Sequence, residues 1–148
     1  MYITDMNNTG AADRTDTNTM LGLLHVAQAL QDRIEGSLGE VDLSMTKLSV
    51  LNALVRSGEA LTLGELAAAA ACVRSNMTQV VDRLERDGLV RRVADPSDRR
   101  VVRAALTPLG AGRQKDGEER LARVQAEFRA SISASDRDAI DRLIQAFS

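Results

Sequence analysis

The sequence of 148 residues has very few of the side chains on which many protein chemistries depend. It contains one cysteine, one histidine, one tyrosine, two phenylalanines and no tryptophan. A single cysteine excludes a framework of intrachain disulfides, and without a Cys/His cluster there is no basis for a structural zinc site. The sequence also has no glycine-rich phosphate loop and no visible set of nucleophile, base and stabiliser. We therefore expect no enzyme activity, no metal and no cofactor.

The sequence also lacks long apolar segments. No stretch approaches the length of a membrane span, and residues 1–18 have neither the basic nor the apolar part of a signal peptide. Their richness in Thr, Asn and Asp is typical of a flexible tail. We therefore expect a cytoplasmic protein without a membrane partner, with a tail over residues 1–18 and a single domain over residues 19–148. Aromatic residues make up only 2% of the chain, and the abundance of Ala, Leu and Val favours a mainly helical fold.

Positive charge is concentrated in one part of the chain. The formal net charge is -2, but the segment from Cys72 to Arg113 has nine arginines and five acidic residues, a local net charge of +4. The remainder therefore carries a net charge of -6. Every basic residue in this segment is arginine, which suits bidentate recognition of phosphate and guanine and insertion into a narrow minor groove. This distribution favours contact with nucleic acid in one region only.

The most informative stretch is Asp98 to Gly110, which has the pattern of a hairpin with a basic tip. Residues 89–93 are β-favouring, residues 101–106 are a plausible partner strand, and the segment from Asp95 to Asp98 has turn chemistry. Thr107 followed by Pro108 is a typical helix start, so the second strand should lead directly into a long helix. A solvated surface hairpin is the alternative when this stretch is taken alone.

The preceding residues favour a helix-turn-helix. Thr62 and Glu65 form the pattern of a capping box at the start of a short helix. After a break near Cys72, a second helix should begin around Ser75. An apolar stripe at helical spacing marks its inner face, and its outer face is polar with arginines near the end. The stripe consists of Met77, Val80, Val81, Leu84 and the flanking Leu89.

Two further helical zones lie outside this region. Residues 19–41 carry apolar side chains at spacings of three and four over about five turns. A helix from Pro108 toward Arg129 is followed by a last helix, which we expect Ser135 to cap. The apolar faces of both the first and the last helix must be buried away from water by other parts of the protein. The sequence therefore predicts a mainly α (α+β) fold, a winged helix-turn-helix with a two-stranded wing over residues 44–107. The helices of residues 19–41 and 108–148 should form a dimerisation region; the alternative is that they cover the core of the single chain.

These motifs together resemble the MarR family of transcriptional regulators. The family pattern of an acid, an arginine, an apolar position, a Leu-Thr pair and a closing glycine is matched by Asp98, Arg100, Ala104, Leu106, Thr107 and Gly110. Ala104 departs from it, because a larger β-branched residue is usual there. The similarity covers residues 20–148. It implies a homodimer that binds double-stranded DNA at an inverted repeat, with half-sites about 34 Å apart, and repression by promoter occlusion as the default.

Roles for individual residues follow from this picture. Ser75, Asn76 and Gln79 are candidates for base contacts, Thr78, Arg83 and Arg86 for phosphate contacts, and Arg74 for either. The resemblance implies that Arg100 enters the minor groove with Asp98 holding its guanidinium. Arg99 and Arg103 are either supporting phosphate ligands or surface charges.

Two other interpretations concern regulation. The resemblance implies a small amphipathic aromatic effector bound between the dimerisation helices and the DNA-binding region. The candidate lining residues, for each of which plain core packing is the more usual role, are His25, Met45, Leu48, Met77 and Phe128. Cys72, beside Arg74 and the start of a helix, could sense oxidants or could be a small buried turn residue. A winged-helix module that binds proteins instead of DNA is a further alternative.

Overall fold

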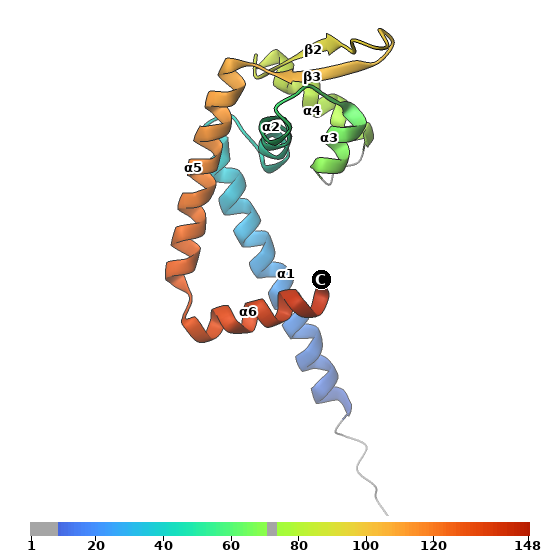
Figure 1. Ribbon diagram of the computed structural model, residues 1–148. Helices are drawn as coiled ribbons and strands as arrows, with labels where there is room; N and C mark the ends of the chain where they lie inside the picture. The colour runs from blue at the N-terminus through green and yellow to red at the C-terminus, as the bar shows by residue number, and fades with distance from the viewer. Residues whose placement is uncertain (1–8, 71–73) are drawn as a thin grey trace, which may run out of the picture.

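Figure 1 shows a lobe at one end of the molecule, from which long helices extend. The computed structural model describes residues 9–70 and 74–148. The lobe contains α2, α3, α4 and the strands, whereas α1 and α5 leave it together and α6 crosses the far end; we call α1, α5 and α6 the arm. The elements are α1 (Thr9–Gly39), α2 (Met45–Ser57), β1 (Leu61–Thr62), α3 (Leu63–Ala69), α4 (Arg74–Arg86), β2 (Val90–Ala94), β3 (Val102–Leu106), α5 (Pro108–Ser131) and α6 (Ala134–Phe147).

The hydrophobic core lies inside the lobe. It forms because α2, α3 and α4 each turn one apolar face inward and the sheet closes the remaining side. The expected stripe of α4 is confirmed, since Met77, Val81 and Leu84 are fully buried and Val80 is partly buried against them. The other large side chains with almost no exposed surface are Leu38, Val50, Leu51, Leu54, Leu66, Leu89 and Val90.

The sheet has three antiparallel strands, with β3 in the middle. The hairpin of β2 and β3 with the intervening loop 95–101, which we call the wing, matches the expected hairpin. The added strand is β1, which pairs Leu61 with Ala104 and Thr62 with Arg103. A strand of two residues is too short to give an alternating pattern, so sequence reasoning missed it. Ala104 is buried at the centre of this sheet, with 1% of its surface exposed.

A tight junction joins the wing to the arm. Gly88 ends α4 with a positive φ of 74°, a conformation that favours glycine. Thr107 caps α5 by accepting from the Gly110 backbone N–H, as expected, and its hydroxyl donates to the Gly88 carbonyl at 2.6 Å. Gly110 lies so close to the preceding loop that an added Cβ would be 2.0 Å from the Leu89 carbonyl oxygen. Strand β3 therefore leads into α5 without a linker.

Three expected helix starts differ in the structure. Helix α1 begins at Thr9, so residues 9–18 are helical instead of belonging to a tail; extending an existing helix costs little even for residues of modest propensity. Helix α4 begins at Arg74, which puts Ser75 inside its first turn. Ser133, and not Ser135, caps α6, because Ser133 and Asp136 form a reciprocal capping box.

Candidate nucleic-acid interface

The outer face of α4 presents a row of polar side chains beside the wing. Because Met77, Val81 and Leu84 fix the inner face of α4 in the core, its polar positions lie on the outer face. The side chains of Asn76, Thr78, Gln79, Arg83 and Arg86 are all exposed, as a DNA-reading surface requires. The side chains of Arg74 and Ser75 and the whole of Cys72 lie outside the described residues, so their expected roles have no structural counterpart here.

The loop of the wing is a compact turn with an arginine at its tip. The Asp95 carboxylate accepts from the backbone N–H groups of Ser97 and Asp98, at 2.7 and 3.1 Å. Asp98 in turn accepts from the backbone N–H and the Nε of Arg100, at 3.0 and 3.2 Å. The contact expected between Asp98 and Arg100 is thus present. The Arg100 side chain is 92% exposed, so its guanidinium is open to a ligand. Arg99 beside it is exposed as well.

Two other arginines of the wing are held in ion pairs. Arg92 on β2 reaches both Asp82 and Glu85 of α4, and the hydrogen bond with Asp82 is the largest influence that raises the pKa of its guanidinium. Arg103 on β3 pairs with Asp95 and Glu65 and is only 28% exposed. The wing strands are therefore fastened to the helix-turn-helix on two sides. Sequence reasoning grouped Arg103 with the exposed arginines and did not anticipate the pairing of Arg92.

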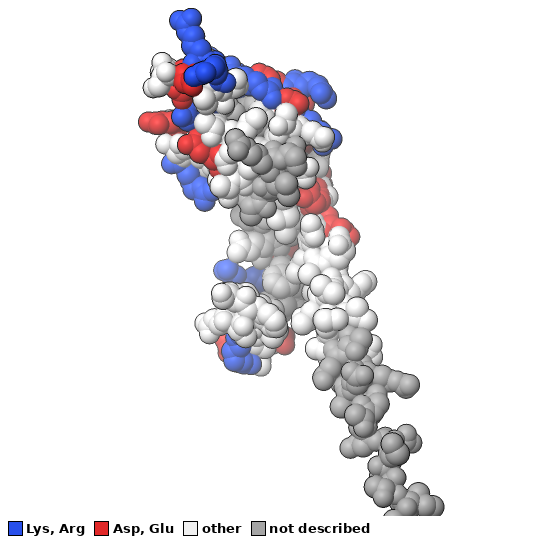
Figure 2. Space-filling view, turned by 90° about the vertical axis from the view of Figure 1, so that its right-hand side faces the viewer, with Lys and Arg blue, Asp and Glu red and all other residues white. Residues whose placement is uncertain are grey.

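Surface charge is distributed unequally between the lobe and the arm. In Figure 2, Lys and Arg side chains gather at the wing end of the lobe, with acidic side chains among them, whereas uncharged side chains dominate the long helix below. Several large apolar residues of the arm are correspondingly exposed: Met20, Leu21, Leu23, Leu24, Val26, Leu143, Ile144 and Phe147. The two ends of the molecule thus offer surfaces of opposite chemistry.

The residues proposed for an effector site do not gather in one cavity. Leu48 and Met77 are buried in the lobe core, with 3% and 0% of their surface exposed, while His25 and Met45 are exposed. Phe128 does line a hollow of about 300 Å³ between α1 and α5. The other residues around that hollow are Leu30, Ile34, Leu121, Val124 and Gln125.

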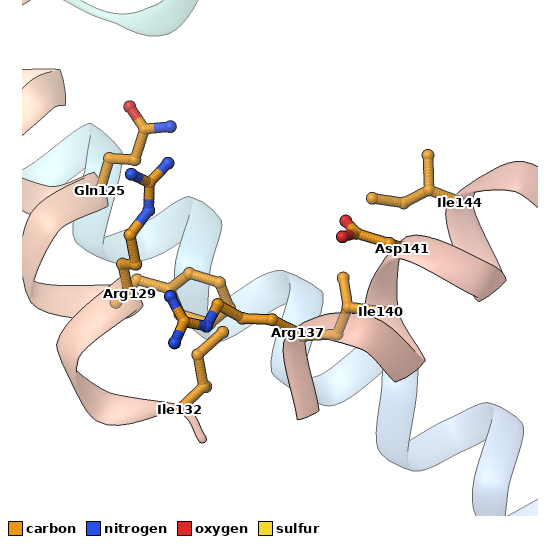
Figure 3. A pocket seen from close by; sticks show the side chains of 8 residues that line it. Gln125, Arg129, Ile132, Arg137, Ile140, Asp141 and Ile144 are labelled. Carbon is orange, nitrogen blue, oxygen red and sulfur yellow. The ribbon is translucent and has the colours of Figure 1, made fainter. Parts of the chain in front are cut away.

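A second hollow, of about 400 Å³, occupies the angle between α5 and α6. Figure 3 shows Arg137 of α6 extending toward α5, whereas Arg129 of α5 points toward Gln125, and Ile140 and Ile144 lie on the α6 side. No sequence pattern indicated this hollow, because it depends on the angle at which the last two helices meet. It is a feature of the arm and lies apart from α4 and the wing (Figure 1).

A helix pair followed by a basic hairpin, with the polar face of the second helix exposed beside it, defines a winged helix-turn-helix protein. Residues 43–102 match the model of the MarR family. The chain is also 34% identical over 88 residues to the uncharacterised HTH-type transcriptional regulator YsmB of Bacillus subtilis (strain 168), and this match spans 60% of each chain. In its winged helix-turn-helix, the chain is thus similar to MarR-family proteins over the segment that the family model and this relative match.

Two solved structures illustrate the likeness. A MarR-like transcription regulator from Bacillus cereus ATCC 10987 superposes with a TM-score of 0.79 at 22% identity, over 90% of this chain and 96% of that one. CouR from Rhodococcus jostii RHA1, solved with p-coumaroyl-CoA bound, gives a TM-score of 0.67 at 26% identity, over 84% and 87%. The relative from Bacillus subtilis and the protein from Bacillus cereus are both described as transcription regulators. Within the part of the chain that the structure describes, no helix has the length and apolar character to cross a membrane.

Proposed function

We propose that this protein is a transcriptional regulator that binds double-stranded DNA in the cytoplasm, with α4 in a major groove and the wing in the adjacent minor groove. The observation that carries the proposal is that the polar face of α4 and the 92% exposed Arg100 lie on one basic lobe. Asn76 and Gln79 are suited to base edges and Thr78, Arg83 and Arg86 to phosphates, because amides read bases in pairs of hydrogen bonds and arginines bind phosphate oxygens. Arg99 is a further phosphate ligand.

The proposal is tested with DNA fragments selected by the purified protein. Arg100→Ala should weaken binding by about tenfold and reduce the dependence of affinity on salt by about one counterion per wing. Arg123→Ala, which removes the same side chain from an exposed position on α5, should leave both quantities unchanged. If no fragment is enriched over random DNA, the protein is instead a winged-helix module with another partner. If Arg100→Ala binds like the wild type, the assignment of the wing is wrong.

We also propose that the chain acts as a homodimer. The exposed apolar residues of α1 and α6 and the hollow at the α5–α6 corner, shown in Figure 3, support an arm that is completed by a second copy. A two-fold axis through the arm would present two recognition helices and two wings. The DNA target would then be an inverted repeat with half-sites about one helical turn, roughly 34 Å, apart. Occupying such a site at a promoter would repress transcription.

A small amphipathic aromatic compound is the proposed effector. The apolar hollow between α1 and α5, with Phe128 and Ile34 in its wall, supports an aromatic ligand, and CouR was solved with an aromatic acyl thioester. Using p-coumaroyl-CoA as the probe, binding should raise the melting temperature and release bound DNA. Phe128→Ser should abolish that shift while leaving DNA affinity without the probe unchanged; a shift that persists in this variant would exclude the hollow.

A further inference from the structure

Arg103 occupies a junction between three parts of the lobe. Its Nε donates to the Asp95 carboxylate at 2.5 Å, and one terminal nitrogen donates to the Ala60 carbonyl and to the Glu65 carboxylate, both at 3.2 Å. These partners come from the wing loop, from the residue before β1 and from the first turn of α3. One planar guanidinium therefore joins the wing to the start of the helix-turn-helix, a geometry that suits arginine and that lysine cannot reproduce.

Both carboxylate partners of Arg103 are themselves fixed by other bonds. Glu65 belongs to the capping box of α3 and accepts from the Thr62 backbone N–H at 2.7 Å. Asp95, with only 11% of its side chain exposed, accepts from the backbone N–H of Asp98. Asp98 holds Arg100. A continuous chain of polar contacts thus runs from the capped end of α3 through Arg103 to the exposed tip of the wing.

The charge of Arg103 is already matched by two carboxylates. The hydrogen bond from Arg103 is the largest influence that lowers the pKa of Asp95, and the bond with Asp95 is the largest that raises the pKa of Arg103. To bind a phosphate, Arg103 would have to leave these partners, whereas Arg100 at 92% exposure would not. On the other side of the wing, Arg92 makes a comparable link from β2 to α4.

We propose that Arg103 is a positioning residue: it fixes the wing against the start of α3 and so sets where Arg100 meets the minor groove, without itself binding DNA. This inference rests on the proposed DNA-binding function. It replaces the role of phosphate ligand that the sequence left open for this residue. It also predicts that Arg103 acts on DNA affinity only through the wing.

A double-mutant cycle on the selected DNA tests this dependence. Arg103→Leu should weaken binding about tenfold in the wild-type background and less than about twofold in the Arg100→Ala background, because a displaced wing has no tip contact left to lose. If Arg103 bound a phosphate directly, its loss would be the same in both backgrounds, and that result would overturn the proposal. Binding by the wild-type protein is the separate test of the proposed function, so the two failures are distinguishable.

A second variant changes DNA affinity in opposite directions depending on whether Arg103 positions the wing or binds a phosphate. Glu65→Gln removes one carboxylate from Arg103, while glutamine can still cap the helix at that position. If Arg103 positions the wing, Glu65→Gln should bind DNA more weakly than Glu59→Gln, which removes an equal charge from the exposed loop before β1. If Arg103 is a phosphate ligand restrained by Glu65, Glu65→Gln should bind more tightly than the control, which would contradict the proposal.

A measurement without DNA completes the design. Backbone amides of residues 97–101 should exchange with deuterium several times faster in Arg103→Leu than in the wild type, because the wing loop loses its anchor. Amides of α2 and α4 should be unaffected, which shows that the variant is folded. Unchanged exchange in the wing would overturn the positioning role even if the protein binds no DNA.

Discussion

The arginines of the wing have identical side chains but different tasks. Arg99 and Arg100 at the tip are exposed, while Arg92 and Arg103 on the strands are held by carboxylates. Sequence reasoning could find the positive segment and the turn between the strands, because both are local. It could not separate these arginines, since the partners of Arg92 and Arg103 are brought near by the packing of the hairpin on α3 and α4.

The titration of Asp95 gives a prediction at this scale. Its pKa in the folded protein should lie below the ordinary value of about 3.9, chiefly because Arg103 donates to it. A depressed pKa means that the carboxylate stabilises the fold above the ordinary value and that this contribution disappears as the pH falls through the folded pKa. Carbon-13 NMR of the carboxyl groups should therefore show Asp95 titrating at lower pH in the wild type than in Arg103→Leu.

Asp136 provides an internal control for that titration. Hydrogen bonds from Ser133 lower its pKa, and it lies on α6, away from Arg103. Its titration should be the same in both proteins. An Asp95 that titrates at its ordinary pH in the wild type would contradict the ion pair.

At the scale of the elements, capping chemistry located two helix starts and missed another, since Ser133 and not Ser135 caps α6. Thr62 and Thr107 cap α3 and α5 where the sequence indicated, because an N-cap depends on residues within three positions of each other. The start of α1 and the strand β1 were missed. Both depend on interactions beyond the local pattern: extension of a long helix in one case, and pairing with β3, which lies more than 40 residues away in sequence, in the other.

Two glycines of α5 test the junction between wing and arm. Gly110→Ala should destabilise the protein by about 3 kcal/mol, because its Cβ would meet the Leu89 carbonyl oxygen at 2.0 Å and force the helix away. Gly112→Ala, two residues further along, meets nothing within 4 Å. It should stabilise the helix by roughly 0.5–1 kcal/mol. Urea denaturation measures both, and equal effects of the two substitutions would exclude a close approach at Gly110.

At the scale of the whole molecule, the arm leaves large apolar side chains exposed in the single chain. Leu24 on α1 is 60% exposed and Phe147 on α6 is 89% exposed, which is unusual for large apolar side chains that do not cluster at an interface. The sequence indicated the need for a cover from the apolar faces alone. It gave no geometry for the α5–α6 corner, because the angle between two helices depends on packing.

We therefore predict that the protein is a dimer in solution. Sedimentation of the wild type should give twice the chain mass of 16.0 kDa, and Leu24→Glu combined with Phe147→Glu should give the single-chain mass, because two buried charges oppose association. Val55→Gln, at an exposed apolar position on α2 in the lobe, should remain dimeric. A wild type that sediments as a single chain would contradict the proposed dimer.

Because no linker separates β3 from α5 at Thr107, a rotation of α5 is transmitted directly to the lobe that carries α4. A helix of 24 residues is about 36 Å long at 1.5 Å per residue. If α5 and the lobe rotate together as one rigid unit, a rotation of about 5° about the base of the helix moves its far end by roughly 3 Å. A small change in how the far ends of two arms meet would thus alter the separation of two wings without any contact in the lobe being broken. Gly110 allows α5 to pack directly against the Leu89 carbonyl, and this contact makes the base of the helix rigid.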